Sequence, residues 1–278
     1  MAERYAENRS TFQDWYAREC WQRLSTKIGA DRVASARRVV DIGCGTGDFT
    51  AELAGLLSAE VSGIDLFEDM VAHARRAYPE LQFHKADLTR ERFKRDQDIA
   101  TSFMALHWPG PNPAFVEGVK SLLRPGGVFC AGFPGVGSTQ QGVDALEAVM
   151  RSPEFAAYFP ADPSLDTFPT MFHREQPESW GELLRQSGFQ DVDARLVTYH
   201  TPYVSEDACF KRLIAAWPPI LSPAYLPADL VGGFLRQAAR VMWDSRYSCA
   251  PSSGDDDRQA PVAYMTSHLV EFTASLPR

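Results

Sequence analysis

Three glycines at alternate positions, Gly43, Gly45 and Gly47, follow a run of β-branched residues and Asp41. Because glycine has no Cβ, its backbone can take a positive φ and a ligand can approach it closely. Residues 49–57 then carry apolar side chains at helical spacing. A helix that begins beside a glycine turn presents free backbone N–H groups and the positive end of its dipole. The stretch therefore predicts a buried strand, a ligand-binding turn and a helix.

The spacing of these glycines separates two classes of ligand. The dinucleotide fingerprint is G-x-G-x-x-G, whereas the third glycine here comes one residue early and Asp48 stands where the last glycine belongs. A carboxylate is a poor neighbour for a pyrophosphate, but it suits a ligand that carries an amino acid and a sulfonium cation. The turn therefore favours such a ligand, and an NAD-dependent dehydrogenase is the rival at the level of the fold.

Two further acids end predicted strands. Asp65 closes the strand 60–65 and lies 20 residues after Gly45, a spacing at which an acid accepts hydrogen bonds from ribose hydroxyls. Asp87 follows the strand 81–85, where its carboxylate would take the exocyclic amine of adenine. The other interpretations are a helix N-cap for Asp65 and a turn residue for Asp87. Apolar or backbone contacts with the adenine ring are expected from Leu66, Met70 and Leu88.

The predicted fourth strand, 98–106, contains Ser102 and runs into His107 and Trp108. In an open α/β sheet the carboxyl end of a central strand faces the ligand crevice, so Ser102 is assigned to the cofactor site. His107 could serve as a base toward a hydroxyl acceptor. The alternative for His107 is a hydrogen-bonded structural histidine at the end of the strand.

The composition excludes several classes of function. The 278 residues are 45% hydrophobic and carry a net charge of −8, which argues against a general nucleic-acid surface. The five cysteines are widely spaced without a C-x-x-C pair, so we expect no metal site and a reduced, cytoplasmic setting. Residues 1–10 lack the apolar core of a signal peptide. The sequence contains no run of about 18 apolar residues, so we expect no membrane span. The oligomeric state cannot be read from the sequence.

The predicted elements divide the chain into a core and its coverings. The expected parts are an N-terminal helical lid (1–35), the ligand-binding core (36–132), a cap insertion (133–178), more core (179–200), a helical cap (201–260) and the last core strand (261–278). The insertion is rich in aromatic residues and methionine. These side chains fit either a small core of its own or the wall of an apolar substrate pocket.

Residues 36–132 resemble the class I S-adenosylmethionine (SAM) dependent methyltransferases, through the glycine motif, the strand-end acids and the turn 123–127. The resemblance implies a doubly wound, seven-stranded, mostly parallel α/β sheet with a helical cap, and SAM as the cofactor. The last strand is expected to run antiparallel to the rest. The positions assigned to the cofactor are Asp41, Gly43, Cys44, Gly45, Gly47, Asp65, Leu66, Met70, Asp87, Leu88 and Ser102.

Two segments, 102–108 and 8–13, are similar to the juvenile hormone acid and trans-aconitate methyltransferase group, which esterifies small carboxylic acids. This resemblance implies that Gln13 and Trp108 hold the substrate carboxylate. A carboxylate oxygen is already an adequate nucleophile, so such a reaction needs orientation rather than a base.

The sequence therefore predicts a SAM-dependent enzyme that methylates a small, fairly apolar molecule, with a carboxylate oxygen as the expected acceptor. One alternative is O-, N- or C-methylation of a secondary metabolite, or a methylation-linked cyclisation. An alternative of another class is a SAM-binding protein without turnover. In each case the partner is a small molecule, with no nucleic acid and no membrane.

Overall fold

The computed structural model describes residues 11–138, 140–165, 173–203, 205–216, 226–245 and 263–278. The chain divides into two compact units. The first comprises Met1–Val136, Phe172–Val197 and Leu269–Arg278, and the second comprises Gly137–Met171 and Thr198–His268. Each unit is assembled from separate stretches of the chain, so the two long strands near the C-terminus contribute residues to both.

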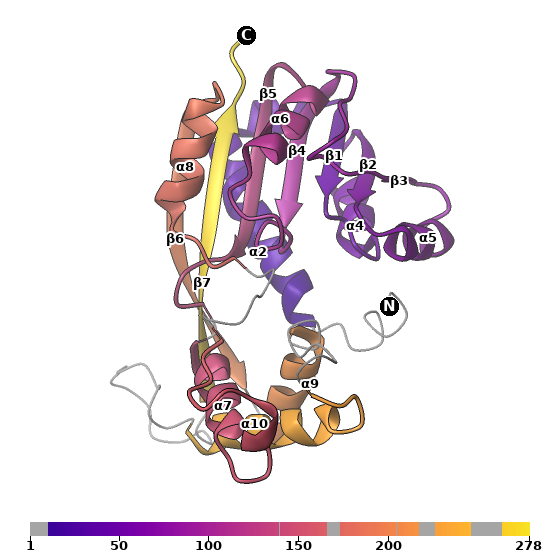
Figure 1. Ribbon diagram of the computed structural model, residues 1–278. Coiled ribbons are helices and arrows are strands. Elements are labelled where there is room, and N and C mark those ends of the chain that lie inside the picture. Colours follow the sequence, from indigo (N-terminus) through magenta and orange to yellow (C-terminus); the bar gives the residue numbers. More distant parts are fainter. Residues whose placement is uncertain (1–10, 139, 166–172, 204, 217–225, 246–262) are drawn as a thin grey trace, which may run out of the picture. The chain divides into compact units, whose positions relative to one another are not determined.

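A seven-stranded sheet in the order β3-β2-β1-β4-β5-β7-β6 forms the centre of the first unit (Figure 1). Its strands are β1 (Arg38–Ile42), β2 (Glu60–Asp65), β3 (Gln82–Lys85), β4 (Gln97–Phe103), β5 (Leu123–Pro134), β6 (Gln190–Tyr203) and β7 (Ala263–Ser275). The first five strands pair in parallel, and β7 runs antiparallel to β5. This confirms the predicted sheet. The strand order reverses between β1 and β4, the point where such sheets bind ligands.

Helices cover both faces of this sheet (Figure 1). They are α2 (Thr11–Ile28), α3 (Ala30–Ala34), α4 (Asp48–Leu56), α5 (Glu68–Ala77), α6 (Pro113–Leu122) and α8 (Pro177–Gln186). Since strand side chains alternate between faces, Phe133 packs with Trp180 of α8, their ring centroids 5.4 Å apart. The next residue toward the start of β5, Gly132, faces Cys20 of α2 on the other side. The helices α6 and α8 thus lie on one face and α2 on the opposite one.

The second unit contains α7 (Gln140–Met150), the 3₁₀ turn η1 (Ala156–Tyr158), α9 (Glu206–Ala216) and α10 (Val231–Asp244). Its aromatic residues pack on one another. The Phe234 ring centroid lies 5.2 Å from that of Phe155 and 5.6 Å from that of Phe159. These two insertion residues are buried, so they build the core of this unit. Phe168, Met171 and Phe172, other apolar residues of the insertion, lie outside the described residues.

One predicted boundary was wrong. The fourth strand ends at Phe103 rather than at residue 106, because Met104 takes a φ of 55° and turns the chain away from the sheet. The predicted turn 123–127 lies within the bounds of β5 as an irregularity: Leu123 pairs with Gln97 and Val128 with Ile99, so residues 124–127 have no partner in β4, and Gly126 takes a φ of 74°. The N-terminal helix begins at Thr11, and the earlier part of the predicted lid lies outside the described residues.

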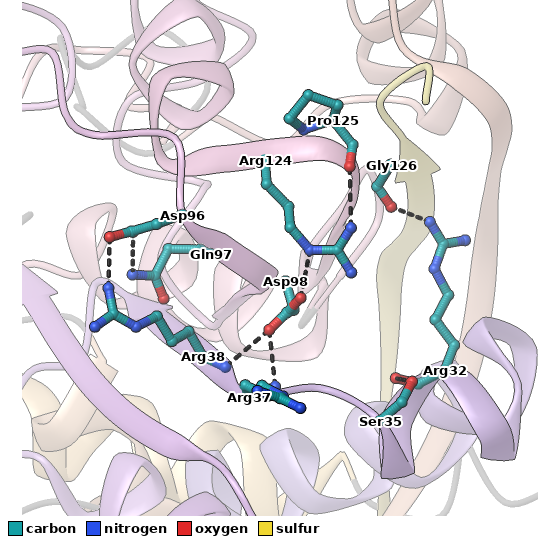
Figure 2. A network of polar contacts seen from close by, with 10 residues as sticks. All are labelled: Arg32, Ser35, Arg37, Arg38, Asp96, Gln97, Asp98, Arg124, Pro125 and Gly126. Carbon is teal, nitrogen blue, oxygen red and sulfur yellow. Dashed lines mark hydrogen bonds and ion pairs between the residues drawn. The ribbon is translucent and has the colours of Figure 1, made fainter.

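A network of charged residues joins the strands at their amino ends (Figure 2). The Asp98 carboxylate accepts hydrogen bonds from the backbone N–H groups of Arg37 (2.8 Å) and Arg38 (2.9 Å), and from Nε of Arg124. Burial alone would raise the pKa of Asp98, but these hydrogen bonds outweigh it, so its pKa lies below the usual value. The network ties β1, β4 and β5 together at the end of the sheet opposite the glycine turn.

Candidate functional site

The glycine turn connects β1 to α4, and its three glycines have positive φ values of 74°, 54° and 87°. A Cβ added at Gly43 would lie 2.4 Å from the Cβ of Ala105, and one at Gly47 would lie 2.9 Å from the Cβ of Ala74. A Cβ added at Gly45 would meet no atom within 4 Å. The outer two glycines are therefore required by packing, whereas Gly45 faces open space where a ligand can reach the backbone.

Asp65 closes β2 directly beside this turn. One carboxylate oxygen accepts a hydrogen bond from the backbone N–H of Gly45, and the other from that of Phe67, both at 2.9 Å. Burial raises the pKa of Asp65 more than these hydrogen bonds lower it. Because each oxygen has two acceptor positions, both can still accept a hydrogen bond from a ligand. The neighbouring Leu66 and Phe67 are half exposed and supply apolar surface, while Met70 is buried.

Asp41, at the end of β1, is the second carboxylate near the turn. It is buried, and it accepts hydrogen bonds from the hydroxyls of Thr50 (2.7 Å) and Thr101 (3.4 Å). These bonds fix the carboxylate between α4 and β4. Asp41 is therefore held in a fixed position on the face of the sheet that carries α4.

A cavity of about 60 Å³ lies beside the turn. Its lining comes from α2, β1, the turn, α4 and the end of β4: Gln13, Ala17, Asp41, Gly43, Cys44, Gly45, Thr46, Phe49, Phe103 and Met104. Pockets for whole small-molecule ligands usually measure about 300 Å³ or more, so this cavity suits one end of a larger ligand. The structure thus brings the predicted residue Gln13 together with four predicted cofactor residues, Asp41, Gly43, Cys44 and Gly45.

Three other residues assigned to the cofactor have protein partners. The Ser102 hydroxyl is fully buried and donates to the carbonyl of Ile42 at 2.9 Å. The Asp87 carboxylate accepts from the backbone N–H (2.9 Å) and hydroxyl (2.6 Å) of Thr89. Leu88 is buried in the main hydrophobic core. Asp87 therefore has the geometry of a turn residue, and the cofactor roles of all three stay predictions.

His107 and Trp108 lie just beyond the end of β4, with ring centroids 5.0 Å apart, and neither belongs to the cavity lining. Burial, with a smaller effect from the charge of His173, lowers the pKa of His107 to about 3. A histidine with such a pKa is neutral near pH 7 and takes up protons poorly. This disfavours His107 as a general base. Trp108 is 37% exposed, so its indole is accessible to a ligand.

Several residues of the cavity lining were not predicted from the sequence. Phe49 and Thr46 adjoin the glycine motif, so their proximity to it was the available signal. Ala17 lies one helical turn after Gln13, and helical spacing could have identified it. Met104 had no such signal, because its position depends on the left-handed backbone conformation that ends β4.

Asp48, which argued against a dinucleotide, is the first residue of α4. Its carboxylate accepts hydrogen bonds from the Tyr78 hydroxyl (2.8 Å) and from the Thr46 hydroxyl. A carboxylate at a helix N-terminus is also favoured by the helix dipole. Asp48 therefore fixes the end of the turn, and its negative charge lies close to the cavity residue Thr46.

Residues 39–127 match the family described as a methyltransferase domain. Over these residues the chain is similar to methyltransferase domains. The match begins in β1 and ends within β5, so it includes the glycine turn and the strand-end acids Asp41, Asp65 and Asp87. This confirms the resemblance to methyltransferases. Gln13 lies outside the matched residues.

Individual proteins are similar over different lengths. A trans-aconitate 2-methyltransferase of Delftia acidovorans is 35% identical over 134 residues, 45% of this chain and 48% of that protein. A demethylmenaquinone methyltransferase of Chlorobaculum parvum is 26% identical over 199 residues, 65% of this chain and 78% of that protein. The solved structure of Haemonchus contortus phosphoethanolamine N-methyltransferase 2, in complex with S-adenosyl-L-methionine, covers 92% of this chain and 52% of that one, with a TM-score of 0.53 and 16% identity.

These similarities cover only part of the curated relatives. The chain spans only 41% and 48% of the length of two of the curated relatives that it matches. At 16% identity, the likeness to the solved structure shows a shared fold and says nothing of the substrate. No described helix is both long and apolar enough to cross a membrane. No group of three or more His, Cys, Asp or Glu that could hold a metal occurs among the residues that the structure describes.

Proposed function

We propose that this protein is a SAM-dependent methyltransferase that converts a small, fairly apolar carboxylic acid to its methyl ester. The observation that carries the proposal is the position of the Asp65 carboxylate, 2.9 Å from the backbone N–H of Gly45 at the open side of the glycine turn. An acid held at the tip of the second strand beside a glycine turn is suited to bind the ribose of a nucleoside cofactor.

The residues around the turn fit the separate parts of SAM. Asp65 can accept hydrogen bonds from the ribose hydroxyls, and the exposed side chains of Leu66 and Phe67 offer apolar surface to the adenine. Gly45 leaves its backbone open to the methionine end, and the buried charge of Asp41 would attract the ammonium and the sulfonium there. When bound, SAM supplies a methyl group on a positively charged sulfur, which a nucleophile can take directly.

A carboxylate is the acceptor that this cavity suits best. Its described lining contains neither histidine nor lysine, and His107 nearby along the chain is a weak base. A hydroxyl acceptor would need a base to remove its proton. A carboxylate has no proton to lose, so its oxygen can take the methyl group without a base. The Gln13 amide can donate a hydrogen bond to the acid, while Phe49 and Phe103 exclude water. The similarity to a trans-aconitate methyltransferase supports the same choice.

The test is a panel of small carboxylic acids incubated with the protein and methyl-labelled SAM. We expect a labelled product that releases its methyl group as methanol on mild alkaline hydrolysis, as a methyl ester does. Gln13→Glu places a second carboxylate in the cavity and should lower turnover about 100-fold through like-charge repulsion. The matched control is Gln22→Glu, the same substitution at an exposed position of α2, which should leave turnover unchanged.

Full turnover by the Gln13→Glu variant would contradict the assignment of Gln13. A product that resists alkali would contradict the carboxylate acceptor and favour carbon or nitrogen methylation, the second candidate. That candidate is supported by the demethylmenaquinone relative, which aligns with 65% of this chain. SAM binding with no release of S-adenosylhomocysteine across the panel would favour a binding protein without turnover.

A further inference from the structure

A buried carboxylate on β7 and a glycine on β5 meet the helix that lines the cavity. We propose that Glu271 and Gly132 are positioning residues, which together set the height of α2 above the sheet and so place Gln13 in the cavity. The proposal rests on the proposed function for the role of Gln13, but not for the packing of α2.

One face of α2 both lines the cavity and contacts Glu271. Gln13, Ala17 and Cys20 follow one another at intervals of four and three residues, so they share a face of the helix. Gln13 and Ala17 line the cavity, and Cys20 is fully buried below them. The Cys20 thiol donates a hydrogen bond to Oε1 of Glu271 at 3.4 Å. Any shift of α2 at Cys20 therefore moves Gln13 as well.

Glu271 supplies the attractive part of this arrangement. Its side chain is 0% exposed, and its Oε2 lies 3.3 Å from Nε of Arg23, one turn further along α2. A buried carboxylate is strongly unfavourable unless a cation or hydrogen-bond donors compensate its charge. Cys20 and Arg23 both belong to α2, so their contacts with the Glu271 carboxylate favour one position of that helix against β7.

Gly132 determines how closely α2 can approach β5. It is paired with Glu271 across β5 and β7, directly under α2. A Cβ added at Gly132 would lie 2.5 Å from Sγ and 3.1 Å from Cβ of Cys20. The backbone of Gly132 is not left-handed, so an alanine there would strain only this contact. The absent Cβ is therefore what lets α2 come close enough for Glu271 to reach Cys20 and Arg23.

A second ion pair on α2 offers a matched control. Nε of Arg18 lies 2.7 Å from the Glu52 carboxylate of α4, but the Arg18 side chain is 56% exposed. Exposed pairs of this kind contribute little because water screens them. Arg18→Gln therefore removes a charged contact of the same helix without disturbing the buried anchor.

The experiment compares Gly132→Ala with the double variant Gly132→Ala and Cys20→Ala in the full chain. Gly132→Ala should push α2 away and lower kcat/KM for the acid roughly tenfold or more, while the Kd for SAM stays within about twofold. Removing Sγ of Cys20 makes room for the added methyl group but also removes one hydrogen-bond donor to Glu271, so the double variant, which keeps Arg23, should recover part of the lost turnover. Normal turnover in Gly132→Ala, or no recovery in the double variant, would overturn the proposal.

A readout that does not use turnover tests the anchor separately. We expect Glu271→Gln to speed the labelling of Cys20 by a thiol reagent about tenfold, measured by peptide mass spectrometry, because α2 lifts more often. In the Arg18→Gln variant, Cys20 should be labelled as slowly as in the original protein. Equal labelling rates in the two variants would refute the role of Glu271 in holding α2. If Glu271→Gln does not fold, Arg23→Met gives the same comparison. If no acid is methylated, the proposed function fails, while the labelling result still decides the role of Glu271.

Discussion

The two ends of the parallel strands use aspartate in opposite ways. At the amino ends, Asp98 accepts hydrogen bonds from two backbone N–H groups and from Arg124, and its pKa is lowered (Figure 2). At the carboxyl ends, Asp65 also accepts from two backbone N–H groups, but it pairs with no lysine or arginine among the described residues. Burial then raises the pKa of Asp65. Similar carboxylates thus have pKa values shifted in opposite directions.

This difference separates stability from binding. A charge that is compensated inside the protein, like that of Asp98, stabilises the fold and has little left to offer a ligand. A buried charge without a cation, like that of Asp65, costs free energy until a ligand supplies hydrogen-bond donors or positive charge. We therefore interpret the amino ends as the structural end of the sheet and the carboxyl ends as its binding end.

Two glycines with positive φ values, at opposite ends of the strands, should differ about 100-fold in their effect on SAM binding. Gly45 and Gly126 have φ values of 54° and 74°, and neither has an atom closer than 3.4 Å to an added Cβ. Alanine at either position should cost about 1 kcal/mol of stability, because both must adopt a left-handed conformation. Only Gly45→Ala should also weaken SAM binding, by about 100-fold, since the new methyl group fills the open side of the turn.

Thermal unfolding and calorimetric titration with SAM measure both quantities for the two variants. Equal loss of SAM affinity in Gly126→Ala would show that backbone strain alone, wherever it lies, disturbs the site. Unchanged affinity in Gly45→Ala would remove the turn from the binding site.

An intermediate effect is expected on the pH dependence of stability. The lowered pKa of Asp98 means that its stabilisation is present above its unfolded pKa and lost as the pH falls through its folded pKa. The Tm advantage of the original protein over Asp98→Asn should therefore narrow in acid. Asp65, whose pKa is raised above 3.8, should show the opposite sign: the advantage over Asp65→Asn narrows as the pH rises. Parallel Tm profiles for the two variants would contradict the comparison.

The smallest expected effect concerns His107. Because burial holds its pKa at about 3, its charge does not change near neutral pH. The profile of kcat against pH should therefore show no step near about 6.5, the ordinary pKa of histidine. A step there that disappears in His107→Asn would restore His107 as a general base and favour a hydroxyl acceptor.

The parts of the fold around the glycine turn that were predicted correctly depend on local sequence. The β-branched residues before the glycines, the glycine spacing and the helical pattern after it predict a turn between β1 and α4. This prediction does not depend on the rest of the chain. The resemblance to the methyltransferases implied the seven-stranded, mostly parallel sheet, and the strand pairing confirms it. The position of Asp65 beside Gly45 then follows, because parallel strands end at the same edge of a sheet.

The rest depends on contacts that are distant in sequence. Asp98 and Arg124 are 26 residues apart, and only the register of β4 and β5 brings them together. At Asp87, both a ligand contact and a turn fit an acid after a strand, and the hydrogen bonds with Thr89 become visible only in the structure. The end of β4 at Phe103 depends on the left-handed conformation of a single residue, Met104. A methionine in the sequence does not predict that conformation.

The central claim is that the carboxyl ends of the strands bind SAM through Asp65. The most direct measurement is calorimetric titration of SAM into the original protein, Asp65→Ala and Asp98→Asn at neutral pH. We expect micromolar binding to the original protein, no measurable binding to Asp65→Ala, and a Kd within about twofold of the original for Asp98→Asn despite its lower Tm. Unchanged affinity in Asp65→Ala would contradict the account.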